Sequence, residues 1–242
     1  MTEQNSKKRP TRVGLISLGC AKNLVDAEIM LGSLLKSGVE ITNDAAQADA
    51  VIVNTCSFID SAQEESVDTI LESAEVREAK NRGQALIVSG CLTQRFRDEL
   101  PKLFPEVDAF MGIDQVAQVS DVVEKAIAHR IQSSKLQAPS SRETPNFKNK
   151  KQISSRFAEL DGANRQAAAP VFDVNARPNF IPDFATPRFR LTPKHFAYVK
   201  IAEGCNHPCS FCIIPQMRGS HRSRRQSDIV AEAKQLIAEG VK

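Results

Sequence analysis

The stretch ADAVIVNTC, residues 48–56, is an almost continuous apolar run that ends in a polar pair and a cysteine. Two other stretches have the same form, RVGLISLGC at residues 12–20 and ALIVSGC at residues 85–91. Apolar runs of this length, without alternating polar residues, are typical of strands buried on both faces of a parallel sheet. The three runs therefore predict three strands of one open sheet.

Helical patterns separate these strands. Apolar residues recur at helical spacing in NLVDAEIMLGSLLKSG, residues 23–38, and Gly38 is a stop signal. Polar or amphipathic helices are also expected at about 60–80 and 93–103, then a short strand at DAFMGI and a closing helix at QVSDVVEKAIAHR. This alternation predicts an α/β domain over residues 1–130, with an open, mostly parallel sheet and helices on both faces.

Residues 131–192 show no clear periodicity. Seven of the twelve prolines fall between Pro139 and Pro193. Sixty residues without a pattern are uncommon inside a compact domain, so we interpret this segment as a Pro-rich, largely irregular linker, disordered in large part. Its basic patch, KNKKQISSRF, could contact phosphates, but such a patch more often lies on a solvated linker.

Order is expected again over residues 193–242. HFAYVKIAEGC, residues 195–205, predicts a strand that leads into a loop, and QSDIVAEAKQLIAEG predicts an amphipathic helix with Ser227 as its N-cap. One strand and one helix cannot bury a self-sufficient core. We therefore expect a domain cut off after its first β–α unit, with everything beyond about Arg130 mobile and open to proteolysis.

Composition is ordinary for a chain with a core. Of the 242 residues, 41% are hydrophobic and 25% are charged, and a net charge of +3 gives no independent argument for nucleic-acid binding. The N-terminus lacks a signal-peptide pattern and no apolar run approaches the length needed to cross a bilayer. We expect a cytoplasmic location without membrane contact, where clustered cysteines more often bind metal than form disulfides.

Three of the six cysteines form a compact motif, Cys205-x3-Cys209-x2-Cys212. Three thiolates on a short loop can bind three irons of a 4Fe-4S cluster and leave the fourth iron open to a small molecule. A zinc site with His207 or His221 as fourth ligand is an alternative, as are three reduced bystander cysteines. Zinc sites favour two C-x2-C pairs, and the loop has one, so the spacing favours an iron–sulfur cluster.

The other three cysteines, Cys20, Cys56 and Cys91, are far apart in sequence, yet each ends a predicted strand. The carboxyl ends of parallel strands meet at one edge of a sheet, where ligands bind. A single cysteine in such a place is usually a small buried apolar residue. Three in the same topological place favour a second iron–sulfur cluster.

Glycines and arginines flank these motifs. Gly19, Gly90 and Gly204 each precede a cysteine, and they fit either ordinary strand-end turns or a close approach of the backbone to a bulky group. A basic run follows the cysteine loop; a solvated face is the favoured interpretation, and contact with RNA phosphate is a minority one. The run consists of Arg218, Arg222, Arg224 and Arg225.

The cysteine motifs and their flanking residues resemble those of the radical S-adenosylmethionine methylthiotransferases. SLGCAKNLVDAE, NTCSFI and SGCLTQR are similar to the three motifs of their N-terminal domain, and EGCNHPCSFCIIPQMRG is similar to their radical loop. SLGC-x-KNLVD and LTP-x-H-x-AY-x-KIAEGC most resemble the branch that modifies ribosomal small-subunit protein number twelve. The resemblance covers residues 12–130 and 191–242.

The resemblance implies a transferase that inserts a methylthio group at the β-carbon of an aspartate in that ribosomal protein. A 4Fe-4S cluster on Cys205, Cys209 and Cys212 would bind S-adenosylmethionine, whose reductive cleavage gives a 5′-deoxyadenosyl radical. A second 4Fe-4S cluster, on the three strand-end cysteines, would hold the sulfur to be methylated and delivered. An external electron donor is implied, and the basic run could contact ribosomal RNA. No catalytic residue is assigned beyond the cluster ligands.

Two departures qualify this expectation. The linker is longer than the family pattern, and most of the radical barrel and a C-terminal RNA-binding-type domain would be missing, so the chain alone is expected to be inactive. A transfer-RNA methylthiotransferase, which differs only in substrate, is the nearer alternative. A non-catalytic iron–sulfur electron carrier or zinc-binding module is the alternative from another class.

Overall fold

The computed structural model describes residues 9–136 and 169–242, and its centre is a six-stranded sheet. The strands run in the order β2-β1-β3-β4-β5-β6, and every neighbouring pair is parallel. The predicted open α/β sheet is therefore confirmed. The strands are β1 (Arg12–Ser17), β2 (Glu40–Ile41), β3 (Ala50–Thr55), β4 (Ala85–Gly90), β5 (Ala109–Met111) and β6 (Val171–Asp173).

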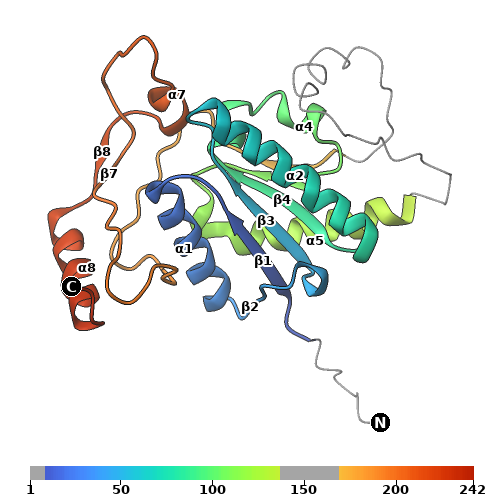
Figure 1. Ribbon diagram of the computed structural model, residues 1–242, viewed down its shortest axis with the longest axis horizontal. Helices are drawn as coiled ribbons and strands as arrows, with labels where there is room; N and C mark the ends of the chain where they lie inside the picture. The colour runs from blue at the N-terminus through green and yellow to red at the C-terminus, as the bar shows by residue number, and fades with distance from the viewer. Residues whose placement is uncertain (1–8, 137–168) are drawn as a thin grey trace.

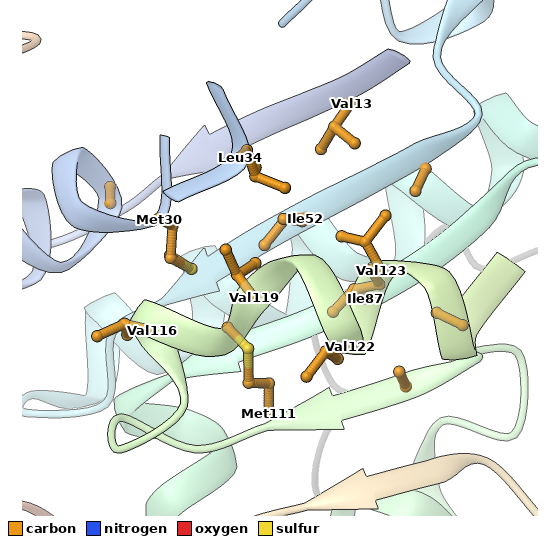
Figure 2. Packing of buried hydrophobic residues seen from close by; sticks show 14 of the residues in the cluster. Val13, Met30, Leu34, Ile52, Ile87, Met111, Val116, Val119, Val122 and Val123 are labelled. Atoms are coloured by element: carbon orange, nitrogen blue, oxygen red, sulfur yellow. The ribbon is translucent and has the colours of Figure 1, made fainter. Parts of the chain in front are cut away.

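Helices cover both faces of the sheet (Figure 1). On one face, α1 (Ala21–Lys36) and α5 (Val119–Leu136) pack over inward-pointing residues such as Ile52 and Ile87, as Figure 2 shows. On the other face, α2 (Asp60–Lys80), α3 (Cys91–Arg95) and α4 (Leu100–Leu103) pack over alternate residues such as Val53 and Val88. Burial of both faces explains why the central strands read as continuous apolar runs.

The predicted helices are present, with one correction. The polar helix at 60–80 is confirmed as α2, but the helix expected over 93–103 is divided into α3 and α4. Pro101 lies in the first turn of α4, where its missing N–H costs nothing; in the interior of a continuous helix it would break the ladder. Two short 3-10 turns, Ala45–Gln47 and Val116–Gln118, complete the connections.

The segment predicted as a linker contributes to this unit where the structure describes it. α5 continues past the expected boundary at residue 130, and β6 extends the sheet beside β5. After β6 the chain is fastened by Asp114, whose carboxylate accepts hydrogen bonds from the backbone N–H groups of Asn179 and Phe180 at 2.9 Å. A strand of only three residues gives no period to detect. The basic patch at 148–157 lies outside the described residues.

The C-terminal part differs most from expectation. The strand predicted over 195–205 is wrong except for β7 (Ala202–Glu203), which pairs antiparallel with β8 (Arg222–Ser223). Between them lies α7 (Ile214–Arg218), and the predicted final helix is confirmed as α8 (Gln226–Ala238). The N-cap of α8 is Arg225, not Ser227, because the helix has already begun at Gln226.

Residues 187–192, here called the strap, lie against α1. Glu28 is fully buried and accepts hydrogen bonds from the backbone N–H of Leu191 at 2.7 Å and from Arg188 Nε at 2.8 Å. Phe189 donates its backbone N–H to the Glu28 carbonyl. In Figure 1 α8, drawn in red, lies on the same side of the molecule as α1. The C-terminal part is thus packed on α1 rather than separate from it.

No helix in the described ranges combines the length and the apolar character that a membrane span requires.

Candidate metal centre

Cys20, Cys56 and Cys91 all lie at the carboxyl edge of the sheet. Cys20 is the N-cap residue of α1 after β1, Cys56 follows β3, and Cys91 opens α3 after β4. Because β1, β3 and β4 are adjacent and parallel, their ends meet at one edge. Cys56 and Cys91 are each 4% exposed, whereas Cys20 is exposed. The structure thus places the three thiols where the strand pattern predicted.

The three glycines before cysteines all adopt positive φ, at +88° for Gly19, +97° for Gly90 and +70° for Gly204. At Gly19 the close approach is also visible, because a Cβ there would lie 2.7 Å from Cys56 Sγ. A side chain at this position would be strained by its backbone and would overlap the neighbouring cysteine. Gly19 therefore lets the loop that carries Cys20 turn directly against Cys56.

The same edge carries buried polar atoms without a hydrogen-bond partner among the described residues. They include Asn54 Oδ1, Ser57 Oγ, Ser89 Oγ and Thr93 Oγ1, each on a residue at or just beyond the end of β3 or β4. Buried polar groups are nearly always paired, so such a concentration calls for an explanation. Free hydrogen-bonding capacity beside three thiols fits the binding of a polar, sulfur-containing group at this edge.

The loop with Cys205, Cys209 and Cys212 lies between β7 and α7. Cys205 donates its backbone N–H to the Gly219 carbonyl at 3.1 Å, and Cys212 donates to the Cys209 carbonyl at 3.1 Å. The His207 backbone N–H lies 3.5 Å from Cys205 Sγ. Phe211, between the last two cysteines, is 91% exposed. The loop is therefore closed at its base and open to solvent at its tip.

The donor chemistry of both cysteine sets suits soft metal ions, but a finished coordination shell is not formed. Among the described residues, no three His, Cys, Asp or Glu side chains are arranged to hold a metal ion. The Nε2 atom of His221, a possible zinc ligand, lies 3.2 Å from Ser223 Oγ. The residues fit an iron–sulfur cluster by type and location, and their role as ligands stays a prediction.

A buried cluster of charges joins the cysteine loop to α1. Arg218 at the end of α7 donates from Nη1 to Asp26 Oδ2 at 2.9 Å and to Glu203 Oε1 at 2.8 Å. Lys200 pairs with the same two carboxylates, with its Nζ 2.6 Å from Glu203 Oε1. All four side chains are almost excluded from solvent. The charges balance within the cluster, and we call these four residues the charge cluster.

The other arm of Arg218 points to the strand edge. Its Nη2 atom donates to Cys91 Sγ at 3.3 Å. One guanidinium thus contacts a strand-end cysteine while its own residue lies on the segment that closes the second cysteine loop. It is a direct physical connection between the two cysteine sets.

The charge cluster shifts the pKa values of its members. Burial raises the pKa of Glu203, but Lys200 and Arg218 outweigh that effect and lower the pKa to about 2. Burial lowers the pKa of Arg218, but Asp26, Cys91 and Glu203 reverse this and hold the pKa well above its ordinary value. Burial raises the pKa of the Cys91 thiol, and Arg218 opposes the burial without cancelling it. Arg218 is therefore a permanent cation.

The interpretation of the basic run as a solvated face is wrong for two of its four residues. Arg218 is 2% exposed and Arg224 is 7% exposed, and Arg224 pairs with Glu232 and donates to the Lys200 carbonyl. Their guanidinium groups point into the protein, so these two cannot reach RNA. Arg222 is half-buried and donates to backbone carbonyls, and Arg225 is exposed.

Sequence reasoning missed Asp26, Lys200 and Glu203. The available signal was charge inside apolar surroundings, as in NLVDAEIML and YVKIAEG. A charged residue at a buried helix position requires a partner. The sequence alone does not reveal which of the many cations that partner is.

Comparison with known proteins shows which protein families this chain resembles. Residues 12–112 match a family described as uncharacterized protein family UPF0004. This range contains the sheet from β1 to β5 and all three strand-end cysteines.

More specific relatives carry the name "Ribosomal protein uS12 methylthiotransferase RimO". The chain is 50% identical over 234 residues to the protein of Opitutus terrae, covering 96% of the chain and 43% of that relative. It is 46% identical to the proteins of Akkermansia muciniphila and Koribacter versatilis, covering 44% and 48% of them. The chain thus spans less than half the length of the curated relatives it matches. Its resemblance to the methylthiotransferases, including those with uS12 in their name, is confirmed.

Proposed function

We propose that this chain is part of a methylthiotransferase that modifies ribosomal protein uS12 in the cytoplasm. The observation that carries the proposal is the convergence of Cys20, Cys56 and Cys91 at one sheet edge, connected to the Cys205 loop through Arg218. Relatives named for this activity match almost the whole chain. The acceptor would be the β-carbon of an aspartate in uS12.

Two 4Fe-4S clusters would be held by the two sets of cysteines. Cys20, Cys56 and Cys91 would hold one, and Cys205, Cys209 and Cys212 would hold the other and provide the site for S-adenosylmethionine. When bound, these groups supply the radical and the sulfur that no side-chain acid or base can supply. Three protein ligands in each set would leave one iron open to exchange.

The residues of the chain would bind, orient and shield these groups. Cys56 and Cys91 are buried, so they would keep the strand-edge group away from water on its protein side. The turn at Gly19 brings the backbone against Cys56, and the turn at Gly90 brings it against Thr55. The charge cluster fixes the base of the Cys205 loop relative to α1, and therefore fixes one cysteine set relative to the other.

The substrate assignment can be tested apart from the chemistry. In a strain that lacks the gene, mass spectrometry should show uS12 without its methylthio group, while methylthiolated adenosine in transfer RNA is unchanged. The intact gene should restore the modification, and the same gene with Cys56→Ala should not. Loss of the transfer-RNA modification with uS12 unaffected would favour a transfer-RNA methylthiotransferase instead.

A further inference from the structure

Arg218 does more than balance the buried carboxylates. Its Nη1 atom already binds both Asp26 and Glu203, and Lys200 lies between the same carboxylates. The Nη2 atom donates to Cys91 Sγ. A structural ion pair alone does not require a contact with sulfur. The planar fork of arginine allows both tasks at once, and the point charge of lysine does not.

The contact between Arg218 and Cys91 Sγ lies where the proposed strand-edge cluster would be bound. Cys91 is 4% exposed and opens α3 directly after β4, at the edge where the three thiols meet. A neutral thiol is a weak hydrogen-bond acceptor, whereas a metal-bound thiolate carries negative charge. A charged donor is stronger still in a site without water. The same 3.3 Å contact therefore becomes more favourable once the sulfur is a ligand.

We propose that Arg218 is a positioning residue that, through its hydrogen bond to Cys91 Sγ, raises the reduction potential of the cluster at the strand edge. The inference rests on the proposed function, because it requires an iron–sulfur cluster on Cys20, Cys56 and Cys91. It assigns to the loop of one cysteine set a direct influence on the group held by the other set.

The direction of the effect follows from electrostatics. Reduction adds a negative charge to a cluster, and a positive charge or a hydrogen bond at a ligand sulfur stabilises the reduced form. Loss of the donor should therefore make the potential more negative. Entry of water into a loosened site acts in the opposite direction, because solvent also stabilises the reduced form. The sign of the shift thus separates the proposed role from a merely structural one.

The chain offers a matched control in Arg224. It is buried like Arg218, follows it closely in sequence, and pairs with Glu232 and the Lys200 carbonyl; within the described part of the chain, none of its hydrogen bonds or ion pairs involves a cysteine. Replacing either arginine by lysine retains a cation in a buried site. In Arg218→Lys the new ammonium group should lie between Asp26 and Glu203 without reaching Cys91 Sγ. In Arg224→Lys a guanidinium group is also lost, but the contact with Cys91 Sγ is retained.

The experiment uses the 242-residue chain with Cys205, Cys209 and Cys212 changed to alanine, reconstituted anaerobically with iron and sulfide. Only the strand-edge cluster then titrates, and its potential is followed by electron paramagnetic resonance. Arg218→Lys should shift the redox equilibrium constant at least tenfold toward the oxidised form, about 59 mV more negative for one electron. Arg224→Lys should titrate like the parent. An unchanged or more positive potential in Arg218→Lys overturns the inference.

The outcomes remain separable. A parent protein that takes up no iron at this edge overturns the proposed function and the inference together. A parent that binds iron and titrates identically to Arg218→Lys overturns only the inference. Should Arg218→Lys fail to fold, the double variant Arg218→Gln with Asp26→Asn decides, since it removes the charged donor and leaves Lys200 paired with Glu203. A shift of the same sign is expected, and no shift contradicts the proposal.

Discussion

At the scale of single residues, the charge cluster is the place where we expect a single substitution to lower stability most. Asp26 and Arg218 are 192 positions apart in sequence, yet both are almost fully buried and joined at 2.9 Å. Removing one partner of a buried ion pair leaves the other charge without compensation, which costs far more than the pair itself contributes.

We expect Asp26→Ala to lower the free energy of unfolding by about 3–5 kcal/mol, because two buried cations lose a shared carboxylate. Denaturant unfolding of the purified chain would measure it. Arg82→Ala is the control: its pair with Glu78 is exposed, with an Arg82 side chain 82% accessible, and should matter by less than about 0.5 kcal/mol. Equal effects of the two variants would contradict the importance of the charge cluster.

Glu203 gives a pH dependence of known sign. Its pKa in the folded protein is about 2, below the ordinary value of 4.5, so the ionised group stabilises the fold above pH 4.5. This contribution is lost as the pH falls from about 4.5 toward about 2.

Comparison of wild type with Glu203→Gln isolates this contribution from other acid effects. The variant should be less stable at neutral pH, and the difference in melting temperature should shrink steadily between pH 4.5 and 2. A difference that stays constant over this range would show that ionisation of Glu203 does not stabilise the fold.

Gly19 tests the close approach at the cysteine edge. Gly19→Ala combines a positive φ, a strain of about 1–2 kcal/mol, with an overlap of the new Cβ and Cys56 Sγ. Gly38→Ala, at φ +82° with nothing within 4 Å of its Cβ, carries the strain alone. We expect Gly19→Ala to be the less stable of the two and to bind less iron. Equal iron content in both would show that the turn at Gly19 does not shape the site.

At the scale of elements, the sequence was most informative where burial is two-sided. The apolar runs at β1, β3 and β4, together with one shared edge, predicted both the sheet and the convergence of Cys20, Cys56 and Cys91. The division at Pro101 was also visible in the sequence, since proline inside a helical pattern marks a boundary.

Other elements have no sequence pattern from which they could be predicted. The strand β6 is too short for a period, and the segment from 195 to 201 has strand-forming residues but no pairing partner among the described strands. Arg218 and Asp26 lie on elements whose contact depends on the tertiary fold, so local sequence cannot pair them. The basic run was misjudged for that reason, because arginine is usually exposed.

The contact between α1 and the strap is tested at Gly32. A Cβ at this position would lie 2.5 Å from the Arg188 backbone nitrogen. In an isolated helix Gly→Ala is favourable by about 1 kcal/mol, so destabilisation by Gly32→Ala can only come from the packed strap. We expect faster hydrogen exchange at Phe189, whose N–H binds the Glu28 carbonyl. A stabilised protein with unchanged exchange would show that the strap does not rest on α1.

At the scale of the whole molecule, side-chain contacts hold the C-terminal segments against the α/β domain. The strap binds Glu28, the charge cluster binds Asp26, and Arg218 reaches Cys91. The contacts with Asp26 and Cys91 join α1 and the cysteine edge of the sheet to Arg218, which follows the second cysteine loop. We propose that this arrangement contains two separate iron–sulfur sites, one on each set of three cysteines.

Metal counting tests that claim most directly. After anaerobic reconstitution, the chain should contain about eight irons and eight sulfides, the content of two 4Fe-4S clusters. Cys56→Ala and Cys209→Ala should each retain about half, and the double variant should retain almost none, because the two sets bind independently. Zinc without sulfide, or a full iron content in both single variants, would contradict the account.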